Sequence, residues 1–418
     1  MATVAVSGEV KKKQKHQQAG RSLWWRVHQW AGLQVSLFLA FILATGTIAT
    51  LSHEIDWLMT PSMRVAPQDG PQASWGALAE AAQSAAGGAR IERISAPIAP
   101  WFAAEALAVG GDGELFRIQI NPWTAQVQGL SSWFNAQRLF RELHRHLMLP
   151  TRWGIPIVTA LAIPMLASTI TALFVYKKWW RGFFRLPRTR PGRRNDGRRY
   201  TGDLHRFAGL WLLWFVALIG VTGLWYLVEW GGGHAPVARP SVTLPSVQAA
   251  GPALDEIVAL ARQDYPALRV TSVYFPEEKP GGVLVMGDAE ALLVRERANI
   301  VMVDPESSAV VERLRGTDLT LHQRISEAAD PLHFGSWGGF ATRLLWFLFG
   351  AGLTGLAVTG VLIYALRLKH DAAAGRAETE QGKNVLAAMW RGMGIMAWPS
   401  AALILLALAL IPAGLAGD

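Results

Sequence analysis

The sequence predicts an α-helical integral membrane protein with a four-helix transmembrane core, a further C-terminal span and two small α+β domains outside the membrane. Of its 418 residues, 51% are hydrophobic and only 17% are charged, whereas soluble domains average about a quarter charged residues. Five apolar stretches have about the 20 residues that a helix needs to cross the hydrocarbon core. The two long segments between them are polar and mixed in charge, which is typical of folded domains rather than of simple loops.

The apolar stretches carry no charge in their middle. They are Trp30–Leu51, Ile155–Tyr176, Phe207–Val228, Trp346–Leu366 and Met393–Leu415. The first is too long for the apolar region of a signal peptide and is expected to remain as a span. We therefore expect, in order, a basic tail (1–23), helix 1 (24–57), outer domain 1 (58–138), helix 2 (139–177), a basic loop (178–201), helix 3 (202–230), outer domain 2 (231–330), helix 4 (331–368), a loop (369–388) and a fifth span (389–416).

Basic residues gather on one predicted side of the membrane. They lie in the N-terminal tail, in the loop after the second stretch and directly after the fourth, at Arg367 and Lys369. The positive-inside rule makes this side cytoplasmic. We therefore expect a multi-pass membrane protein with a cytoplasmic N-terminus. The juxtamembrane position accounts for the charge through membrane lipid, so a nucleic-acid partner is not expected.

The chain repeats itself. The motif VHQWAGL, which contains His28 and Gly32, matches LHRFAGL, which contains His205 and Gly209, and a Thr-Gly pair follows both at the same spacing. The second and fourth stretches end alike, in TALFVY and TGVLIY. Each outer segment reads as a short helix, alternating strands, an Asn-Pro or Asp-Pro turn and another strand. The sequence therefore predicts an internal duplication.

Several kinds of site are excluded by residue type. The chain has no cysteine, which excludes disulfides, thiolate zinc sites, cysteine-ligated iron–sulfur clusters and covalent haem attachment. It also has no Walker A loop, no G-x-G-x-x-G after a strand and no H-E-x-x-H. Electrons, if the protein carries them, must come from a separate donor, either a soluble reductase or a quinol.

The order of the motifs resembles the PepSY-associated transmembrane helix family, which includes inner-membrane siderophore-iron reductases. The resemblance covers about residues 20–370 and is carried by VHQWAGL, HEIDWLMTP, LHRHLMLPTRWG, GDLHRFAGL and PLHFGSWGGF. It implies a haem-binding four-helix core with PepSY domains outside the membrane. The fifth span extends beyond that core.

The histidines at the cytoplasmic ends of two repeated helices are the first candidate haem ligands. A non-covalently held low-spin haem needs two axial imidazoles on facing helices, and His28 and His205 stand at matched positions. Gly32 and Gly209 follow one turn later on the same helix face, where a missing side chain leaves room for the porphyrin. The alternative is that each histidine is simply an interfacial polar residue.

The outer ends of the helices carry further histidines. We expect His333 to bind a second haem with His144, while His146 and His53 are alternative ligands. A zinc or copper site formed by His144, His146 and His333 is a competing interpretation. Thr45, Gly46, Thr222 and Gly223 are expected to serve close helix packing.

The predicted function is that of a di-haem oxidoreductase with two haem b per chain. Electrons would pass from the cytoplasmic side to a periplasmic acceptor, which the resemblance implies is a ferric siderophore that releases its iron on reduction. One alternative is a membrane-anchored PepSY binding or regulatory module without redox activity. A transporter is a third possibility, weakened because the sequence shows no mid-span polar residues and no broken helices.

Overall fold

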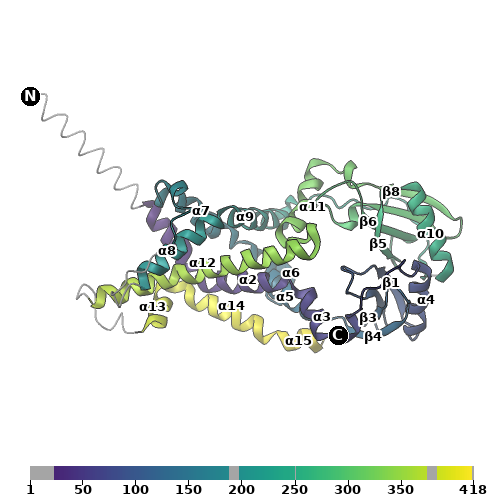
Figure 1. Cartoon of the computed structure of the whole chain (residues 1–418), viewed down its shortest axis with the longest axis horizontal. Coiled ribbons are helices and arrows are strands. Elements are labelled where there is room, and N and C mark those ends of the chain that lie inside the picture. Colours follow the sequence, from purple (N-terminus) through teal and green to yellow (C-terminus); the bar gives the residue numbers. More distant parts are fainter. Residues whose placement is uncertain (1–22, 188–196, 250, 374–383, 417–418) are drawn as a thin grey trace, which may run out of the picture. The chain divides into compact units, whose positions relative to one another are not determined.

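The computed structural model describes residues 23–187, 197–249, 251–373 and 384–416 (Figure 1). Most of the basic tail and parts of the two predicted cytoplasmic loops lie outside these ranges. The chain forms two compact units. A helical unit comprises Met1–Ile48, Arg141–Trp230 and Phe347–Ile411, and a sheet unit comprises Ala49–Phe140, Gly231–Trp346 and Pro412–Asp418.

Four helices among the described residues are candidates for crossing the membrane. Helices long and apolar enough to span are Thr151–Val175, Leu213–Gly233, Ser336–His370 and Gly394–Gly414. The helix Leu23–Gln34 and α2 (Ser36–Ala49) form a bent pair. If the two cross the membrane together, they make a fifth span. The structure thus has the helices of a multi-pass membrane protein.

Several of these helices are broken where the sequence suggested one continuous element. The stretch 24–57, expected as one helix, divides into Leu23–Gln34, α2 and α3 (Ser52–Met59), with a 63° bend at the first break. There the Ser36 hydroxyl donates to the carbonyl of Leu33 at 2.9 Å, a side-chain bond of a kind that bends helices.

The remaining helices show similar divisions. Their bounds are α5 (Ala136–His146), α6 (Thr151–Thr159), α7 (Ala162–Val175), α8 (Gly197–Trp211), α9 (Leu213–Val228), α12 (Gly339–Ala373), α13 (Val385–Gly392), α14 (Ala397–Ala409) and α15 (Ile411–Ala416). Helix 2, expected over 139–177, is α5, α6 and α7, and helix 3, expected over 202–230, breaks between α8 and α9. Helix 4, expected from residue 331, follows α11 (Leu321–Phe334) through Gly335, whose φ of 67° ends that helix. This left-handed conformation favours glycine.

The sheet unit contains one eight-stranded antiparallel sheet. Its strands are β1 (Arg90–Ser95), β2 (Ala104–Val109), β3 (Leu115–Ile120), β4 (Val127–Ser132), β5 (Arg269–Tyr274), β6 (Val283–Asp288), β7 (Ile300–Asp304) and β8 (Ala309–Leu314). Their order across the sheet is β4-β3-β2-β1-β5-β6-β7-β8. As expected, Asn-Pro and Asp-Pro turns connect β3 to β4 and β7 to β8.

The pairing of β1 with β5 corrects the expectation of two separate outer domains. Ile94 lies opposite Val273 in this pair, so strands from both outer segments form one sheet. Without the pairing β1 and β5 would each be an exposed edge strand, which proteins avoid. Helices α4 (Trp75–Ala85) and α10 (Gly251–Asp264) pack together and share one apolar core with the strands of both halves.

One carboxylate adds hydrogen bonds to the contact between α4 and α10. Asp255 on α10 accepts hydrogen bonds from the Ser74 hydroxyl at 2.7 Å and from the Gly76 amide at 2.8 Å. A Cβ atom at Gly76 would lie 2.6 Å from the Gly251 carbonyl oxygen. Glycine at this position therefore allows the two helices of the sheet unit to approach closely.

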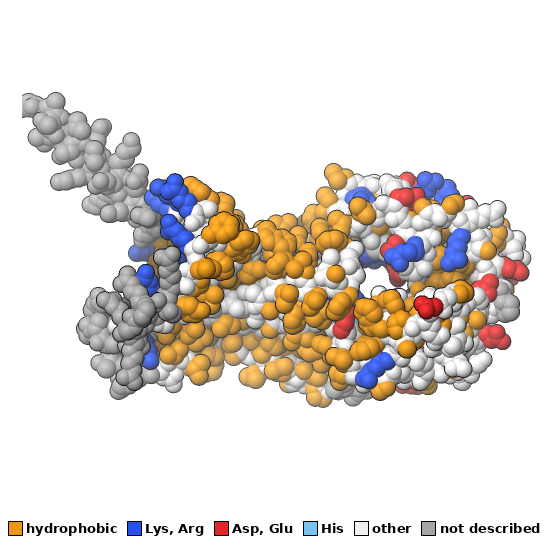
Figure 2. Space-filling view, in the orientation of Figure 1, with side chains coloured by type: hydrophobic (Ala, Val, Ile, Leu, Met, Phe, Trp, Pro, Cys, Tyr) orange, Lys and Arg blue, Asp and Glu red, His pale blue; other side chains and the backbone are white. Residues whose placement is uncertain are grey.

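The surfaces of the two units differ in composition. Figure 2 shows mostly apolar side chains on the visible face of the helical unit, with Lys and Arg at one end, and charges of both signs on the sheet unit. An apolar surface of this kind suits contact with lipid.

Candidate functional site

A cavity of about 290 Å³ lies inside the helical unit. Its walls come from the helix Leu23–Gln34 and from α2, α7, α8, α9 and α12, so both halves of the sequence contribute. Most of the lining surface is apolar. His28 and His205 both face the cavity, together with Gly32 and Gly209. The structure thus brings the predicted inner pair and its two glycines to one place.

His28 is held by the helix opposite. Its Nδ1 atom lies 2.9 Å from the carbonyl oxygen of Ser168, and the hydroxyls of Ser168 and Thr171 are 3.2 and 3.4 Å away. A carbonyl oxygen only accepts hydrogen bonds, so Nδ1 of His28 must carry the proton and donate it. In the neutral imidazole this leaves the lone pair on Nε2.

His205 is held in a corresponding way. Its Nδ1 atom lies 2.9 Å from the Thr359 hydroxyl, which itself donates to the carbonyl of Gly355 at 2.7 Å. Because the hydroxyl proton is already used, Thr359 accepts from Nδ1–H of His205, and Nε2 again has the lone pair. Thr171 and Thr359 are the first residues of the repeated segments TALFVY and TGVLIY.

The glycines leave open space beside the histidines. A Cβ atom at Gly32 would have Ser168 Oγ as its nearest neighbour at 3.8 Å, and one at Gly209 would have Leu356 Cδ2 at 3.9 Å. Neither glycine is needed for close packing of helices, because both positions could hold a small side chain. A larger side chain at either position would project into the cavity.

His144 lies in the same unit but does not line the cavity. Its Nδ1 atom is 2.8 Å from the carbonyl oxygen of Ile42 on α2, and a Cβ atom at Gly46 would lie 2.5 Å from its Cε1 atom. Gly46 therefore lets the imidazole of His144 lie against the α2 backbone. Gly46 was expected to allow close packing, and it does so, but it packs against the side chain of His144 rather than against another helix backbone.

The other expected outer histidines have different surroundings. His333 belongs to the sheet unit, on α11, where its ring contacts Phe334 with centroids 5.4 Å apart. His53 lies on α3 in the same unit. The Nδ1 atom of His146, at the end of α5, is buried without a hydrogen-bond partner among the described residues. The pairing of His144 with His333 stays a prediction.

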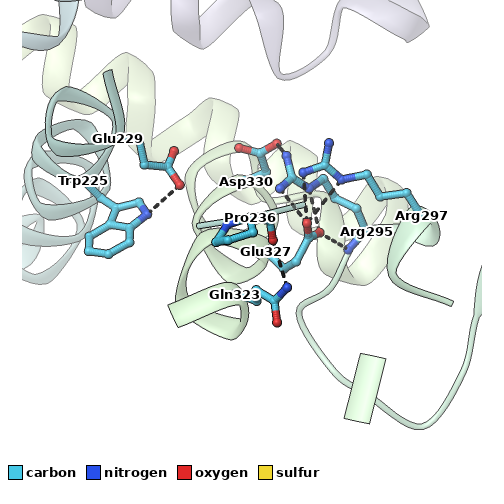
Figure 3. A network of polar contacts seen from close by, with 8 residues as sticks. All are labelled: Trp225, Glu229, Pro236, Arg295, Arg297, Gln323, Glu327 and Asp330. Atoms are coloured by element: carbon cyan, nitrogen blue, oxygen red, sulfur yellow. Dashed lines mark hydrogen bonds and ion pairs between the residues drawn. The ribbon is translucent and has the colours of Figure 1, made fainter. Parts of the chain in front are cut away.

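The neighbourhood of His333 contains a charged network that the motifs did not indicate. Arg295 binds the carboxylates of Glu327 at 2.8 Å and Asp330 at 2.6 Å, and Arg297 binds Glu327 at 2.9 Å (Figure 3). Glu327 and Asp330 lie six and three residues before His333 on α11. The sequence shows their charges but not which loop supplies the arginines.

A further ion pair that the motifs did not indicate joins the HEIDWLMTP segment to the beginning of helix α12. Glu54 on α3 and Arg343 on α12 approach to 2.8 Å with both side chains largely buried. In the same segment, Asp56 accepts hydrogen bonds from the amides of Ala136 and Gln137 at 2.7 and 3.0 Å. Asp56 therefore caps the N-terminus of α5, the helix that carries His144 and His146.

No group of three or more His, Asp or Glu side chains in the described ranges is arranged to hold a metal ion. The cavity holds two imidazoles, which is the number of protein ligands that a bis-histidine haem uses.

The model of a family described as the PepSY-associated TM region matches residues 25–367, from within the helix Leu23–Gln34 to within α12. No curated protein matches the chain. Because the match covers most of the sequence, the chain belongs to the PepSY-associated transmembrane family.

Proposed function

We propose that the protein is a membrane oxidoreductase that binds haem b between His28 and His205. The observation that carries this proposal is the cavity to which two matched histidines, one from each half of the sequence, present imidazoles with the proton on Nδ1. A hydrogen bond at Nδ1 that fixes tautomer and ring orientation is the usual support of a metal-binding imidazole. An interfacial polar role does not require both histidines to face one apolar cavity.

The residues present fit this cofactor. His28 and His205 would hold the iron through Nε2, the open positions at Gly32 and Gly209 would leave space for a flat ring, and the apolar lining would suit a macrocycle. Haem, when bound, supplies a one-electron carrier. The chain's own part is to hold the ligands, exclude water and keep the site in an apolar environment that affects the reduction potential.

The proposal extends to a second haem and to an acceptor. His333 and His144 are the proposed outer ligands, with His146 and His53 as alternatives. The acceptor is a ferric siderophore at the sheet unit, and the donor is a reductase or a quinol at the basic end of the helical unit. One electron converts Fe(III) to Fe(II), which the siderophore holds more weakly. These assignments, with a bacterial inner-membrane location and a cytoplasmic N-terminus, rest on the family resemblance and on the basic residues.

An optical spectrum of the detergent-purified full chain tests the inner site. We expect a sharp reduced α-band and about two haems per chain, and we expect His205→Ala to lose the inner haem while the outer one stays. Gly209→Leu should do the same by filling the cavity.

Two matched controls accompany these variants. His234→Ala changes an exposed histidine of the sheet unit, and Gly355→Leu adds a side chain where a Cβ atom meets nothing within 4 Å. Both should keep full haem content. A protein that stays colourless after haem is supplied would refute the oxidoreductase and support the anchored binding module instead.

A further inference from the structure

One charged side chain lines the cavity that contains His28 and His205. Among the lining residues that the structure describes, Arg367 is the one with a formal charge at neutral pH, and the other polar groups there are neutral. Its side chain is exposed near the C-terminal end of α12, and its guanidinium carbon lies 5.3 Å from the ring centroid of Trp25. Trp25 also lines the cavity.

The position of Arg367 on α12 relates it to the proposed ligands. Leu356, Gly360, Tyr364 and Arg367 line the cavity at helical spacing, and Thr359 between them holds His205. Arg367 follows Thr359 by eight residues, which is about 12 Å along a helix at 1.5 Å per residue. This is a separation that an extended arginine and a propionate arm can bridge together.

The chemistry of the two ends of the cavity differs accordingly. Leu353 lies 14 residues before Arg367 on α12, about 21 Å along a helix, and is aliphatic like the lining residue Val216, whereas Arg367 and Trp25 form a cationic end. Haem is likewise asymmetric, since one edge is hydrocarbon and the other carries two propionates. A guanidinium that stacks on an aromatic face presents its N–H groups at its edge, where they can bind a carboxylate in a bidentate manner.

We propose that Arg367 is the propionate anchor of this cavity, an inference that rests on the proposed haem site. Its guanidinium binds a haem carboxylate at the Trp25 end, so the cofactor enters with its hydrocarbon edge toward Leu353 and Val216. Arg367 is then a positioning residue that fixes the orientation of the ring and selects porphyrins with free carboxylates.

The test compares haem b with its dimethyl ester, which has the same ring and iron but no carboxylate charge. Full-length protein produced under haem limitation is titrated with each in detergent, and dissociation constants are read from the Soret band. The His333→Ala background isolates the inner site. We expect the parent to prefer haem b over the ester by about tenfold or more, as for a charge-assisted hydrogen bond.

Variants assign the preference to Arg367. Arg367→Gln should bind both porphyrins with the affinity that the parent shows for the ester, and Arg367→Lys should keep part of the preference. Lys369→Gln removes the same charge from an exposed position outside the cavity lining and should behave as the parent does. The midpoint potential of the bound haem should fall in Arg367→Gln, because a nearby positive charge is lost.

The outcomes separate the two proposals. Equal affinity of the parent for haem b and the ester, or an undiminished preference in Arg367→Gln, would overturn the propionate anchor while leaving the haem site in place. Failure of both porphyrins to bind to the parent would remove the haem site and the anchor with it.

Discussion

The hydrogen bonds at Nδ1 of His28 and His205 determine which ring nitrogen of each histidine has the lone pair. His28 uses a backbone carbonyl for this purpose, whereas His205 depends on a single side chain, Thr359. The hydrogen bond from His205 to Thr359 can be removed by a conservative substitution, because valine has the shape of threonine without the hydroxyl.

We predict that Thr359→Val weakens haem binding at the inner site by about 10- to 100-fold. This is the usual effect of removing the hydrogen-bond acceptor that orients a metal-binding histidine. The loss has two causes, since the ring becomes less fixed and the buried Nδ1–H is left without an acceptor. Titration of the apoprotein with haem b, followed at the Soret band, measures the change.

The matched control for this prediction is Thr354→Val, on the same helix. The Thr354 hydroxyl donates to its own helix at the Gly350 carbonyl, 3.0 Å away, and Thr354 does not line the cavity. Equal effects of the two substitutions would show that threonine supports α12 in general rather than His205.

At the scale of elements, helix α11 is tied to the preceding loop by Glu327. Burial alone would raise the pKa of Glu327, but hydrogen bonds from Arg295 and the charges of Arg295 and Arg297 outweigh it and hold this pKa below its ordinary value of 4.5. A carboxyl group whose pKa is lowered by folding stabilises the fold above its ordinary pKa, and that contribution is lost as pH falls through the folded value.

We predict that Glu327→Gln destabilises the sheet unit by about 2 kcal/mol at pH 7, as expected for loss of a buried hydrogen-bonded charge. The parent should lose stability on acidification through and below pH 4.5, and the variant should lose less over the same range. Thermal unfolding of the full chain at pH 7 and pH 4 measures both quantities.

Glu278→Gln is the control for this effect because it changes an exposed carboxylate of the same unit. It should leave the melting temperature at pH 7 unchanged. If Glu327→Gln kept the stability and the pH dependence of the parent, the network would not hold α11 in place.

At the scale of the whole molecule, two segments far apart in the sequence share one sheet. The pairing that joins the two halves of the sheet is short: β1 and β5 share three residue pairs, from Arg93–Tyr274 to Ser95–Ser272. The core beneath it is continuous, because Ile94 and Val273 are fully buried. Unfolding one half of the sheet would therefore expose the core of the other.

Hydrogen–deuterium exchange tests this organisation. We predict that peptides covering β1 and β5 exchange as slowly as those of β2 and β6, and more slowly than those of the edge strands β4 and β8, because central strands open only with the whole unit. Exchange of β1 and β5 at the rate of the edge strands would instead indicate two domains that open independently.

Local patterns were enough to predict much of the architecture. Hydropathy predicted several membrane helices, and alternation with Pro turns indicated the segments that form β3, β4, β7 and β8. Repeated His and Gly spacing selected His28, Gly32, His205 and Gly209, which line one cavity. These features depend on residues close together in the chain, which a sequence displays directly.

Only the tertiary structure shows which strands pair and which side chains contact each other. In the structure β1 pairs with β5, and the first span bends at Ser36. Ser168 forms a hydrogen bond with His28, Thr359 forms one with His205, and Arg367 lines the cavity. The physical reason is that hydrogen bonds, ion pairs and strand pairing join residues that chain order does not relate. Composition and spacing specify which elements form, whereas packing specifies which of their faces meet.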